Sequence, residues 1–139
     1  MEVIPGQIRQ LFQNIVSNAL KFSKKDMAPV IHIGVNRTGE LKFDSESSDN
    51  GAFCKISIGD NGIGFNEMYK EKIFTMFQRL HSKEAFEGTG IGLAIVKKIV
   101  EKHNGIITVN SREGEGTTFT LVLPIQQNKP VVAEQLSAI

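Results

Sequence analysis

The sequence predicts a protein of the α/β class, because stretches with the spacing of helices occur together with stretches that have the spacing of strands. Apolar residues recur every three or four positions in residues 7–25 and 92–103, which predicts two amphipathic helices. Apolar and polar residues alternate in four other stretches, as they do in strands. The predicted strands are residues 30–36, 52–59, 106–111 and 117–124.

The first predicted helix has one apolar face and a polar shoulder. Its apolar residues are Ile8, Leu11, Phe12, Ile15, Val16, Ala19 and Leu20. At about 100° per residue, Asn14, Asn18 and Lys21 fall in one stripe beside that face. We expect these side chains to line a cleft next to the core, although a solvated helix face is the preferred explanation when they are taken alone.

The segments between the predicted elements are polar. Residues 37–51 predict a strand end followed by a loose surface loop. Residues 67–78 have a helical pattern, and residues 79–89 form a charged linker. Asn104 and Gly105 predict the C-terminal cap of the second helix.

Length and composition indicate one domain without a strong electrostatic preference. The 139 residues suffice for one hydrophobic core, which we assign to residues 1–124, with residues 125–139 as a tail or linker. Sixteen Lys and Arg against fifteen Asp and Glu give a net charge of +1, so nucleic acid is not an expected partner. Cys54 has no second cysteine to pair with, and the chain shows neither an apolar run of about 20 residues nor a signal peptide. We expect a cytoplasmic domain that does not insert into the membrane.

Residues 88–105, GTGIGLAIVKKIVEKHNG, place glycines at alternate positions at the start of a helix. The unpaired N–H groups and the dipole of a helix N-terminus favour anions, so this stretch suggests phosphate binding. The dinucleotide motif G-x-G-x-x-G does not fit, because Leu93 occupies its sixth position and no strand precedes it. The phosphate loop G-x-x-x-x-G-K-[ST] does not occur either. A different nucleotide-binding fold is required.

Five motifs occur in an order that resembles the catalytic ATP-binding domain of bacterial sensor histidine kinases. They are Asn14-x-x-x-Asn18-Ala-Leu-Lys21-Phe22, Asp60-Asn-Gly-Ile-Gly-Phe65, Ile73-Phe74-Thr-Met-Phe77-Gln-Arg79, Gly88-Thr-Gly90-Ile-Gly92-Leu93-Ala and Gly114-Glu-Gly116-Thr117-Thr-Phe119. The resemblance covers residues 4–124 and extends to the wider superfamily of gyrase, heat-shock chaperone and mismatch-repair ATPases. It implies a two-layer α/β sandwich, with a mixed sheet covered by helices on one face, that binds ATP and Mg²⁺.

The resemblance implies that Asp60 accepts a hydrogen bond from the exocyclic amine of adenine, where guanine carries a carbonyl. A turn-forming Asp in Asp-Asn-Gly is the simpler explanation when that motif is read alone. Gly62 and Gly64 are expected to form a turn with positive φ near the base. Thr117 is expected to hold a water shared with Asp60, although a Thr in a hairpin strand is nearly as frequent. The expected pocket walls, which suit the core equally well, are Phe22, Ile63, Ile73, Leu93 and Phe119.

The resemblance assigns Mg²⁺ to Asn18, with Asn14 as a second ligand. A neutral carbonyl oxygen suits a hard ion that takes much of its neutralising charge from phosphates. Lys21, one turn further on, is expected to reach a phosphate as a point charge.

A lid over the ATP is implied for residues 79–92. Its phosphate-facing end consists of Gly88, Thr89, Gly90 and Gly92, where glycines permit the change of conformation that binding requires. Arg79 resembles the lid arginine that stabilises charge on the transferred γ-phosphoryl group. An exposed ion pair of Arg79 with Glu84 or Glu87 is the alternative.

One position departs from the hydrolysing members of the superfamily. They and the related serine kinases have Glu where this chain has Asn14, and an amide is no general base at pH 7. This favours the histidine kinase branch, in which a separate dimerisation domain supplies the phosphorylated histidine and a response regulator receiver domain acts downstream.

No histidine of this chain has the phosphoacceptor pattern. We expect His32, His81 and His103 to be half-exposed strand, loop and helix-end residues. The chain is expected to begin about one strand and one helix short of the family's catalytic domain. A catalytically silent nucleotide-binding module and an autonomous ATPase remain the alternatives.

Overall fold

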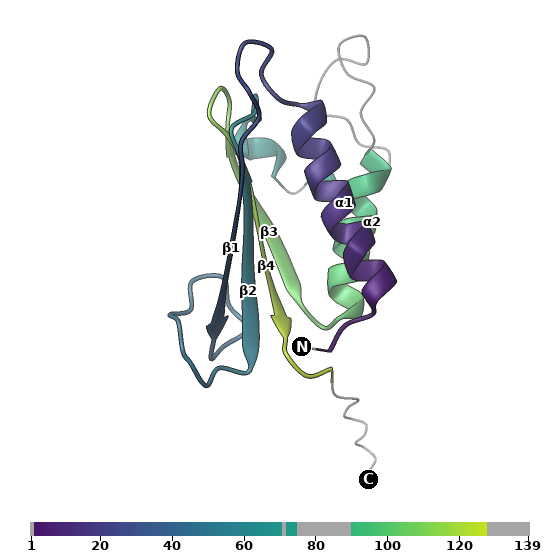
Figure 1. The fold of residues 1–139 in the computed structure, drawn as a ribbon, viewed down its shortest axis with the longest axis vertical. Coiled ribbons are helices and arrows are strands. Elements are labelled where there is room, and N and C mark those ends of the chain that lie inside the picture. Colours follow the sequence, from purple (N-terminus) through teal and green to yellow (C-terminus); the bar gives the residue numbers. More distant parts are fainter. Residues whose placement is uncertain (1, 71, 75–89, 128–139) are drawn as a thin grey trace.

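The computed structural model describes residues 2–70, 72–74 and 90–127. Two long helices lie against one face of a sheet (Figure 1), so the predicted two-layer α/β sandwich is confirmed. The elements follow in the order α1 (Pro5–Lys21), β1 (Ile31–Thr38), β2 (Phe53–Asp60), η1 (Glu67–Tyr69), η2 (Lys72–Phe74), α2 (Gly90–Lys102), β3 (Ile106–Arg112) and β4 (Gly116–Pro124).

The sheet has the strand order β1-β2-β4-β3, and each neighbouring pair is antiparallel. The mixed sheet that the sequence predicted is therefore not found among the described strands. The crossover through α2 explains the difference, because β2 and β3 run in the same direction but β4 lies between them.

Helix α1 is displaced toward the N-terminus relative to its prediction. It starts at Pro5, where the missing N–H of proline is no loss in the first turn. It ends at Lys21 and not at Lys25, because Phe22 leaves helical geometry and its carbonyl accepts a hydrogen bond from the N–H of Ile63 at 3.0 Å. A tertiary contact therefore ends the helix before its sequence pattern does.

The core lies between the two helices and the helix-facing side of the sheet. From α1 it takes Leu11, Ile15 and Ala19, whereas Leu20 is 50% exposed, contrary to its predicted place on the apolar face. The sheet and α2 supply most of the other large buried side chains. They include Ile56, Ile58, Val96, Ile99, Val100, Val109, Phe119, Leu121 and Leu123.

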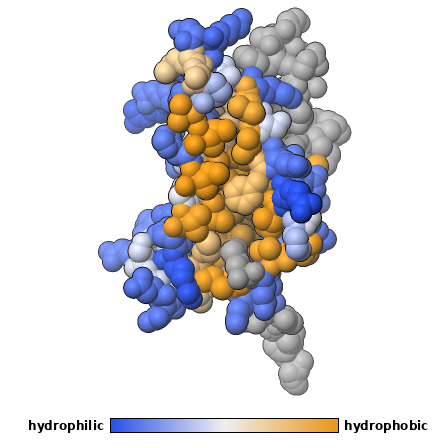
Figure 2. Space-filling view, viewed as in Figure 1, coloured by the Kyte–Doolittle hydropathy of each residue, from blue (hydrophilic) through white to orange (hydrophobic). Residues whose placement is uncertain are grey.

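Strand β1 is an edge strand among the described residues. Ile33 and Val35 pair with Ile58 and Ile56 and so lie on the helix-facing side, but they are 55% and 63% exposed. Figure 2 shows an apolar stretch on this side of the molecule. The two helices therefore cover β2, β4 and β3 better than they cover β1.

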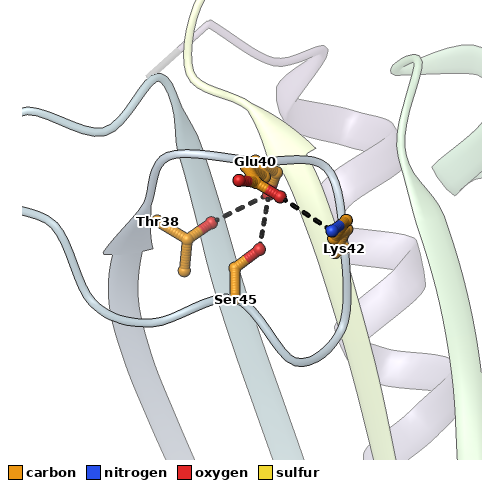
Figure 3. Close-up of polar contacts among 4 residues, drawn as sticks. All are labelled: Thr38, Glu40, Lys42 and Ser45. Atoms are coloured by element: carbon orange, nitrogen blue, oxygen red, sulfur yellow. Dashed lines mark hydrogen bonds and ion pairs between the residues drawn. The ribbon is translucent and has the colours of Figure 1, made fainter.

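The segment between β1 and β2 is tied by hydrogen bonds, so the prediction of a loose loop is wrong. Nε and Nη2 of Arg37 donate to the Gly51 carbonyl at 3.0 and 2.7 Å. The hydroxyls of Thr38 and Ser45 donate to the Glu40 carbonyl at 3.2 and 3.4 Å, and Lys42 pairs with the Glu40 carboxylate at 3.1 Å (Figure 3). Sequence patterns do not encode these contacts, because each depends on the path of the loop.

His103 is 1% exposed, so the prediction of a half-exposed residue is wrong. Its Nε2 accepts a hydrogen bond from the N–H of Ile4 at 3.0 Å, and its Nδ1 lies 2.8 Å from the Ile99 carbonyl. The proton therefore sits on Nδ1 of a neutral imidazole. His103 thus ties the chain that enters α1 to the end of α2, while His32 on β1 is exposed and His81 lies outside the described residues.

Residues that follow β4 are bound to the same region. The N–H of Glu2 donates to the Ile125 carbonyl at 2.7 Å, and the N–H of Ile125 donates to the Ala52 carbonyl at 2.9 Å. The Gln127 amide donates to the His103 carbonyl at 2.8 Å. Ile125 to Gln127 therefore make direct contacts with the body of the domain.

The β3–β4 hairpin turns through two glycines with positive φ, Gly114 at 83° and Gly116 at 124°. A Cβ on Gly114 would meet nothing within 4 Å, whereas a Cβ on Gly116 would overlap the backbone carbonyl of Asp60. Of these two glycines, Gly116 alone combines an unusual backbone conformation with a close approach to another strand.

We predict that Gly116→Ala destabilises the protein much more than Gly114→Ala. The Gly114 substitution adds only the backbone strain of a positive φ, about 1 to 3 kcal/mol, whereas the Gly116 substitution adds a clash that costs about 1 to 3 kcal/mol more. Free energies of unfolding from urea titrations measure the difference. Equal losses for the two variants would contradict the close approach of Gly116 to Asp60.

Candidate functional site

A row of polar side chains crosses one end of the helix-facing side of the sheet. Thr117 of β4 pairs with Asp60 of β2 on one side and with Ser111 of β3 on the other. Paired residues in an antiparallel sheet point to the same face, so these three side chains lie side by side. The next row inward, formed by Ile58, Phe119 and Val109, is fully apolar and buried. The sequence predicted Asp60 and Thr117 in the site but missed Ser111.

Asp60 is half-buried at the end of β2 and accepts backbone hydrogen bonds. Its Oδ1 lies 2.8 Å from the N–H of Gly62, and the N–H of Thr117 donates to the same carboxyl group. Burial raises the pKa of Asp60 above its usual value, and the two backbone hydrogen bonds oppose that shift. The ionised carboxylate offers only hydrogen-bond acceptors, so it suits a ligand that carries a donor.

The loop after Asp60 lies between the end of α1 and the β3–β4 hairpin. The N–H of Ile63 donates to the Phe22 carbonyl at 3.0 Å, and the Ile63 carbonyl accepts from the N–H of Gly114 at 2.7 Å. Three segments that are far apart in the sequence therefore meet at this loop.

Both predicted glycines of this loop are required, but for different reasons. Gly64 has the predicted positive φ, at 66°. Gly62 does not, so that part of the prediction is wrong, and Gly62 is needed because a Cβ there would lie 2.6 Å from the Phe22 carbonyl oxygen. The two glycines thus let the loop pack against backbone on both sides.

Ser111 connects this loop to the hairpin. It is 4% exposed, and its hydroxyl contacts the N–H of Phe65 at 2.8 Å, the carbonyl of Gly116 at 2.9 Å and the hydroxyl of Thr117 at 2.9 Å. Its own N–H donates to the Glu67 carboxylate at 2.8 Å. A serine in a strand carries no signal for such a role, so sequence reasoning could not identify Ser111.

Asn61 was also missed. Its side-chain oxygen accepts from the N–H of Val30 at 2.9 Å, and its side-chain amide donates to the Ala28 carbonyl at 3.2 Å. Asn61 therefore holds the connection between α1 and β1 against the loop that follows Asp60.

The predicted residues of α1 lie where the helical wheel placed them. Asn14 and Asn18 are half-buried and Lys21 is exposed, as expected for the shoulder of an amphipathic helix. Lys21 directly precedes Phe22, whose carbonyl contacts the loop after Asp60. The C-terminal end of the stripe thus lies next to that loop.

The predicted pocket walls divide into two groups. Phe22 and Ile63 are half-buried and belong to the contact between α1 and the loop. Ile73 and Phe119 are each 2% exposed and Leu93 is 8% exposed, and all three belong to the hydrophobic core. Phe74 packs edge-on against Phe119 with ring centroids 6.1 Å apart, which joins η2 to the sheet.

The predicted lid falls largely outside the described residues, and so do Arg79, Gly88 and Thr89. Gly90 and Gly92 belong to the first turn of α2, which begins two residues earlier than predicted.

Among the described residues, no group of three His, Cys, Asp or Glu side chains is placed to hold a metal ion. In the same part of the chain, no helix is both long enough and apolar enough to cross a membrane.

Comparison with known proteins identifies the family. Residues 4–127 match the family described as histidine kinase-, DNA gyrase B- and HSP90-like ATPases. The chain is 45% identical over 119 residues to cyanobacterial phytochrome A of Nostoc sp., which covers 86% of this chain and 14% of the phytochrome. It is 37% identical over 131 residues to the sensor histidine kinase WalK of Bacillus subtilis, which covers 93% of this chain and 20% of WalK.

Solved structures of histidine kinases have the same fold. The mycobacterial sensor histidine kinase MprB superposes with a TM-score of 0.67 at 25% identity, over 86% of this chain and 72% of that one. The catalytic domain of the histidine kinase ThkA superposes with a TM-score of 0.66 at 29% identity, over 89% of this chain and 70% of that one. The chain therefore belongs to the histidine kinase-, DNA gyrase B- and HSP90-like ATPase family, as a histidine kinase-type ATPase domain homologous to the catalytic domains of sensor kinases.

Proposed function

We propose that the chain binds Mg-ATP and transfers the γ-phosphoryl group to a histidine on the dimerisation domain of the same kinase. The single observation that carries this proposal is the pair of Asp60 and Thr117 at the end of the sheet. The pair lies beside the loop after Asp60, which bonds to the end of α1 and to the β3–β4 hairpin. The chain spans 14% and 20% of the length of the phytochrome and of WalK, so the activity of the whole protein is part of the proposal.

The base is recognised by hydrogen-bond polarity. The Asp60 carboxylate is held by two backbone N–H groups and keeps acceptor capacity for a donor on the ligand. The exocyclic amine of adenine is such a donor, whereas guanine has a carbonyl at that position. Gly62 and Gly64 keep side chains out of the loop, which lets its backbone lie close to the base.

In this proposal the phosphates lie along the stripe on α1, and residues 79–92 act as the lid over them. Asn18 and Asn14 would hold Mg²⁺ through their amide oxygens, and Lys21 would contact a phosphate. When bound, Mg²⁺ neutralises phosphate charge during transfer. An amide oxygen suits this ion because it is a hard, neutral ligand and the phosphates supply the negative charge. Gly88, Thr89, Gly90 and Gly92 would contact the phosphates, and Arg79 would stabilise the transferred group.

The chain itself supplies no general base where hydrolysing relatives have one. Asn14 is a neutral amide, so neither water nor a hydroxyl is activated there. The imidazole on the dimerisation domain is the nucleophile, and a response regulator receiver domain takes the phosphoryl group next. In this proposal the domain acts in a bacterial two-component phosphorelay in the cytoplasm.

We predict that the protein binds ADP but not GDP, and that Asp60→Asn weakens ADP binding. Replacing a carboxylate acceptor by an amide leaves one donor or acceptor mismatched, which costs about 1 to 3 kcal/mol, or roughly 5- to 150-fold in affinity. Titration calorimetry measures the dissociation constants, and Asp49→Asn, at an exposed carboxylate of the β1–β2 loop, is the matched control. Equal affinity for ADP and GDP would contradict the assignment of the base site.

We predict that Asn18→Ala removes most of the Mg²⁺ dependence of ATP binding and leaves the fold intact. The side chain lies on the half-buried shoulder of α1 and not on its apolar face, so alanine is compatible with the helix. ATP affinity is compared with Mg²⁺ and with EDTA, and Ser17→Ala, at an exposed neighbour on α1, is the control. If Mg²⁺ still strengthens binding to Asn18→Ala as much as to the parent, Asn18 is not a ligand.

We predict that the isolated chain turns over ATP very slowly and does not phosphorylate itself. Addition of the dimerisation domain of its own kinase should yield an acid-labile, alkali-stable phosphohistidine on that partner, because the nucleophile is then present. Labelling with γ-³²P-ATP measures transfer, and a partner whose histidine is replaced by glutamine is the control. Rapid phosphate release by the chain alone would favour an autonomous ATPase, and binding of ATP without any transfer would favour a silent nucleotide-binding module.

A further inference from the structure

We propose that Ser111 is a positioning residue for base selection, because its hydroxyl dictates the direction of the Thr117 hydroxyl proton. The end of the sheet then offers only hydrogen-bond acceptors to a bound base. This inference rests on the proposed function, since it concerns the same nucleotide site, and it adds a residue with no direct contact to the nucleotide.

The Ser111 hydroxyl lies at the centre of three hydrogen bonds. Phe65 N–H contacts its oxygen at 2.8 Å, the Gly116 carbonyl lies at 2.9 Å and the Thr117 hydroxyl lies at 2.9 Å. Ser111 is 4% exposed, so water does not compete for these contacts from outside. The side chain is therefore held from three directions by groups of known polarity.

The positions of the two hydroxyl protons follow from the partners. The Gly116 carbonyl can only accept, so the single Ser111 proton must point to it. The N–H of Phe65 can only donate, and it uses one lone pair of the Ser111 oxygen. The remaining lone pair faces Thr117, whose hydroxyl must therefore be the donor in that contact. The reverse direction would leave the Ser111 and Gly116 oxygens 2.9 Å apart with no proton between them.

The Thr117 oxygen is left with its lone pairs and no proton for a ligand. Thr117 is paired in register with Asp60, whose ionised carboxylate is also an acceptor. Two neighbouring acceptors favour a purine with an amine at the six position. They disfavour a purine with a carbonyl at that position, because oxygen would then face oxygen. Ser111 therefore affects selectivity without touching the base.

A separate feature keeps this arrangement rigid. The N–H of Ser111 donates to the Glu67 carboxylate, and Phe65 belongs to the loop that carries Gly62 and Gly64. One residue of β3 thus ties η1, the loop after Asp60 and the β3–β4 hairpin together. Rotation of the Thr117 hydroxyl away from Ser111 would break one of the three hydrogen bonds of the Ser111 hydroxyl.

The test compares binding of ADP and inosine diphosphate, which has a carbonyl in place of the amine. The readout is the ratio of their dissociation constants, because a purely structural defect weakens both nucleotides alike and leaves the ratio unchanged. In Ser111→Ala, the Thr117 hydroxyl loses its acceptor and becomes free to donate to the carbonyl of inosine. We expect the preference for ADP to fall about tenfold or more, the size of one mismatched hydrogen bond.

A double-mutant cycle shows whether Ser111 acts through Thr117. Thr117→Val removes the hydroxyl, and in that background Ser111→Ala should leave the ratio unchanged. Ser111→Thr keeps a hydroxyl and should restore the preference of the parent. Ser57→Ala is the control, because this serine lies in β2 on the opposite side of the sheet from Asp60 and should not alter the ratio.

Ser111→Ala leaves the N–H of Phe65 without its acceptor, so Ser111→Cys provides a second variant of similar shape. Its thiol is a weak acceptor, and its ratio should also fall. An unchanged ratio in Ser111→Ala or Ser111→Cys overturns the inference, and so does an equal fall in the Thr117→Val background. If the parent binds neither nucleotide, or binds both equally, the proposed function fails and the inference about Ser111 fails with it.

Discussion

Close contact between backbone segments at one end of the sheet is the constraint on which the candidate site depends. A Cβ on Gly116 would overlap the Asp60 carbonyl, and one on Gly64 would overlap the Arg112 carbonyl. Gly62 lies against the Phe22 carbonyl in the same way. The ends of α1 and β2 and the β3–β4 hairpin meet only because these three positions carry no side chain, and their meeting brings Asp60, Thr117 and Ser111 into one row.

On this face of the sheet, the apolar core changes to the polar candidate site between one row of paired residues and the next. Ile58, Phe119 and Val109 fill the row below it with buried apolar side chains. Burial at this boundary raises the pKa of Asp60, and backbone N–H groups oppose the shift by donating to the carboxylate. Ser111 is buried at the same boundary, so water does not compete for its hydroxyl and the hydroxyl proton keeps one orientation.

Prediction from sequence succeeded where the signal is local. The periodicity of residues 7–25 indicated α1, and alternation indicated all four described strands, with errors of one or two residues at most of their ends. Prediction failed where a contact with a distant segment determines the local structure. The helix stops at Lys21 because the N–H of Ile63 bonds to the Phe22 carbonyl. The imidazole of His103 is held by the N–H of Ile4, and the loop after β1 is held by Arg37 and Thr38.

The sequence by itself determined the class of fold and the family, because periodicity and ordered motifs can be read along the chain, and it named residues of the candidate site as predictions. Asp60, Thr117 and the glycines of the loop could be named in advance for this reason. The tertiary structure alone decided the antiparallel pairing, which of Gly62 and Gly64 adopts positive φ, and the inclusion of Ser111 and Asn61. These depend on register and on hydrogen bonds between segments more than 30 residues apart in the chain, and no local pattern records them.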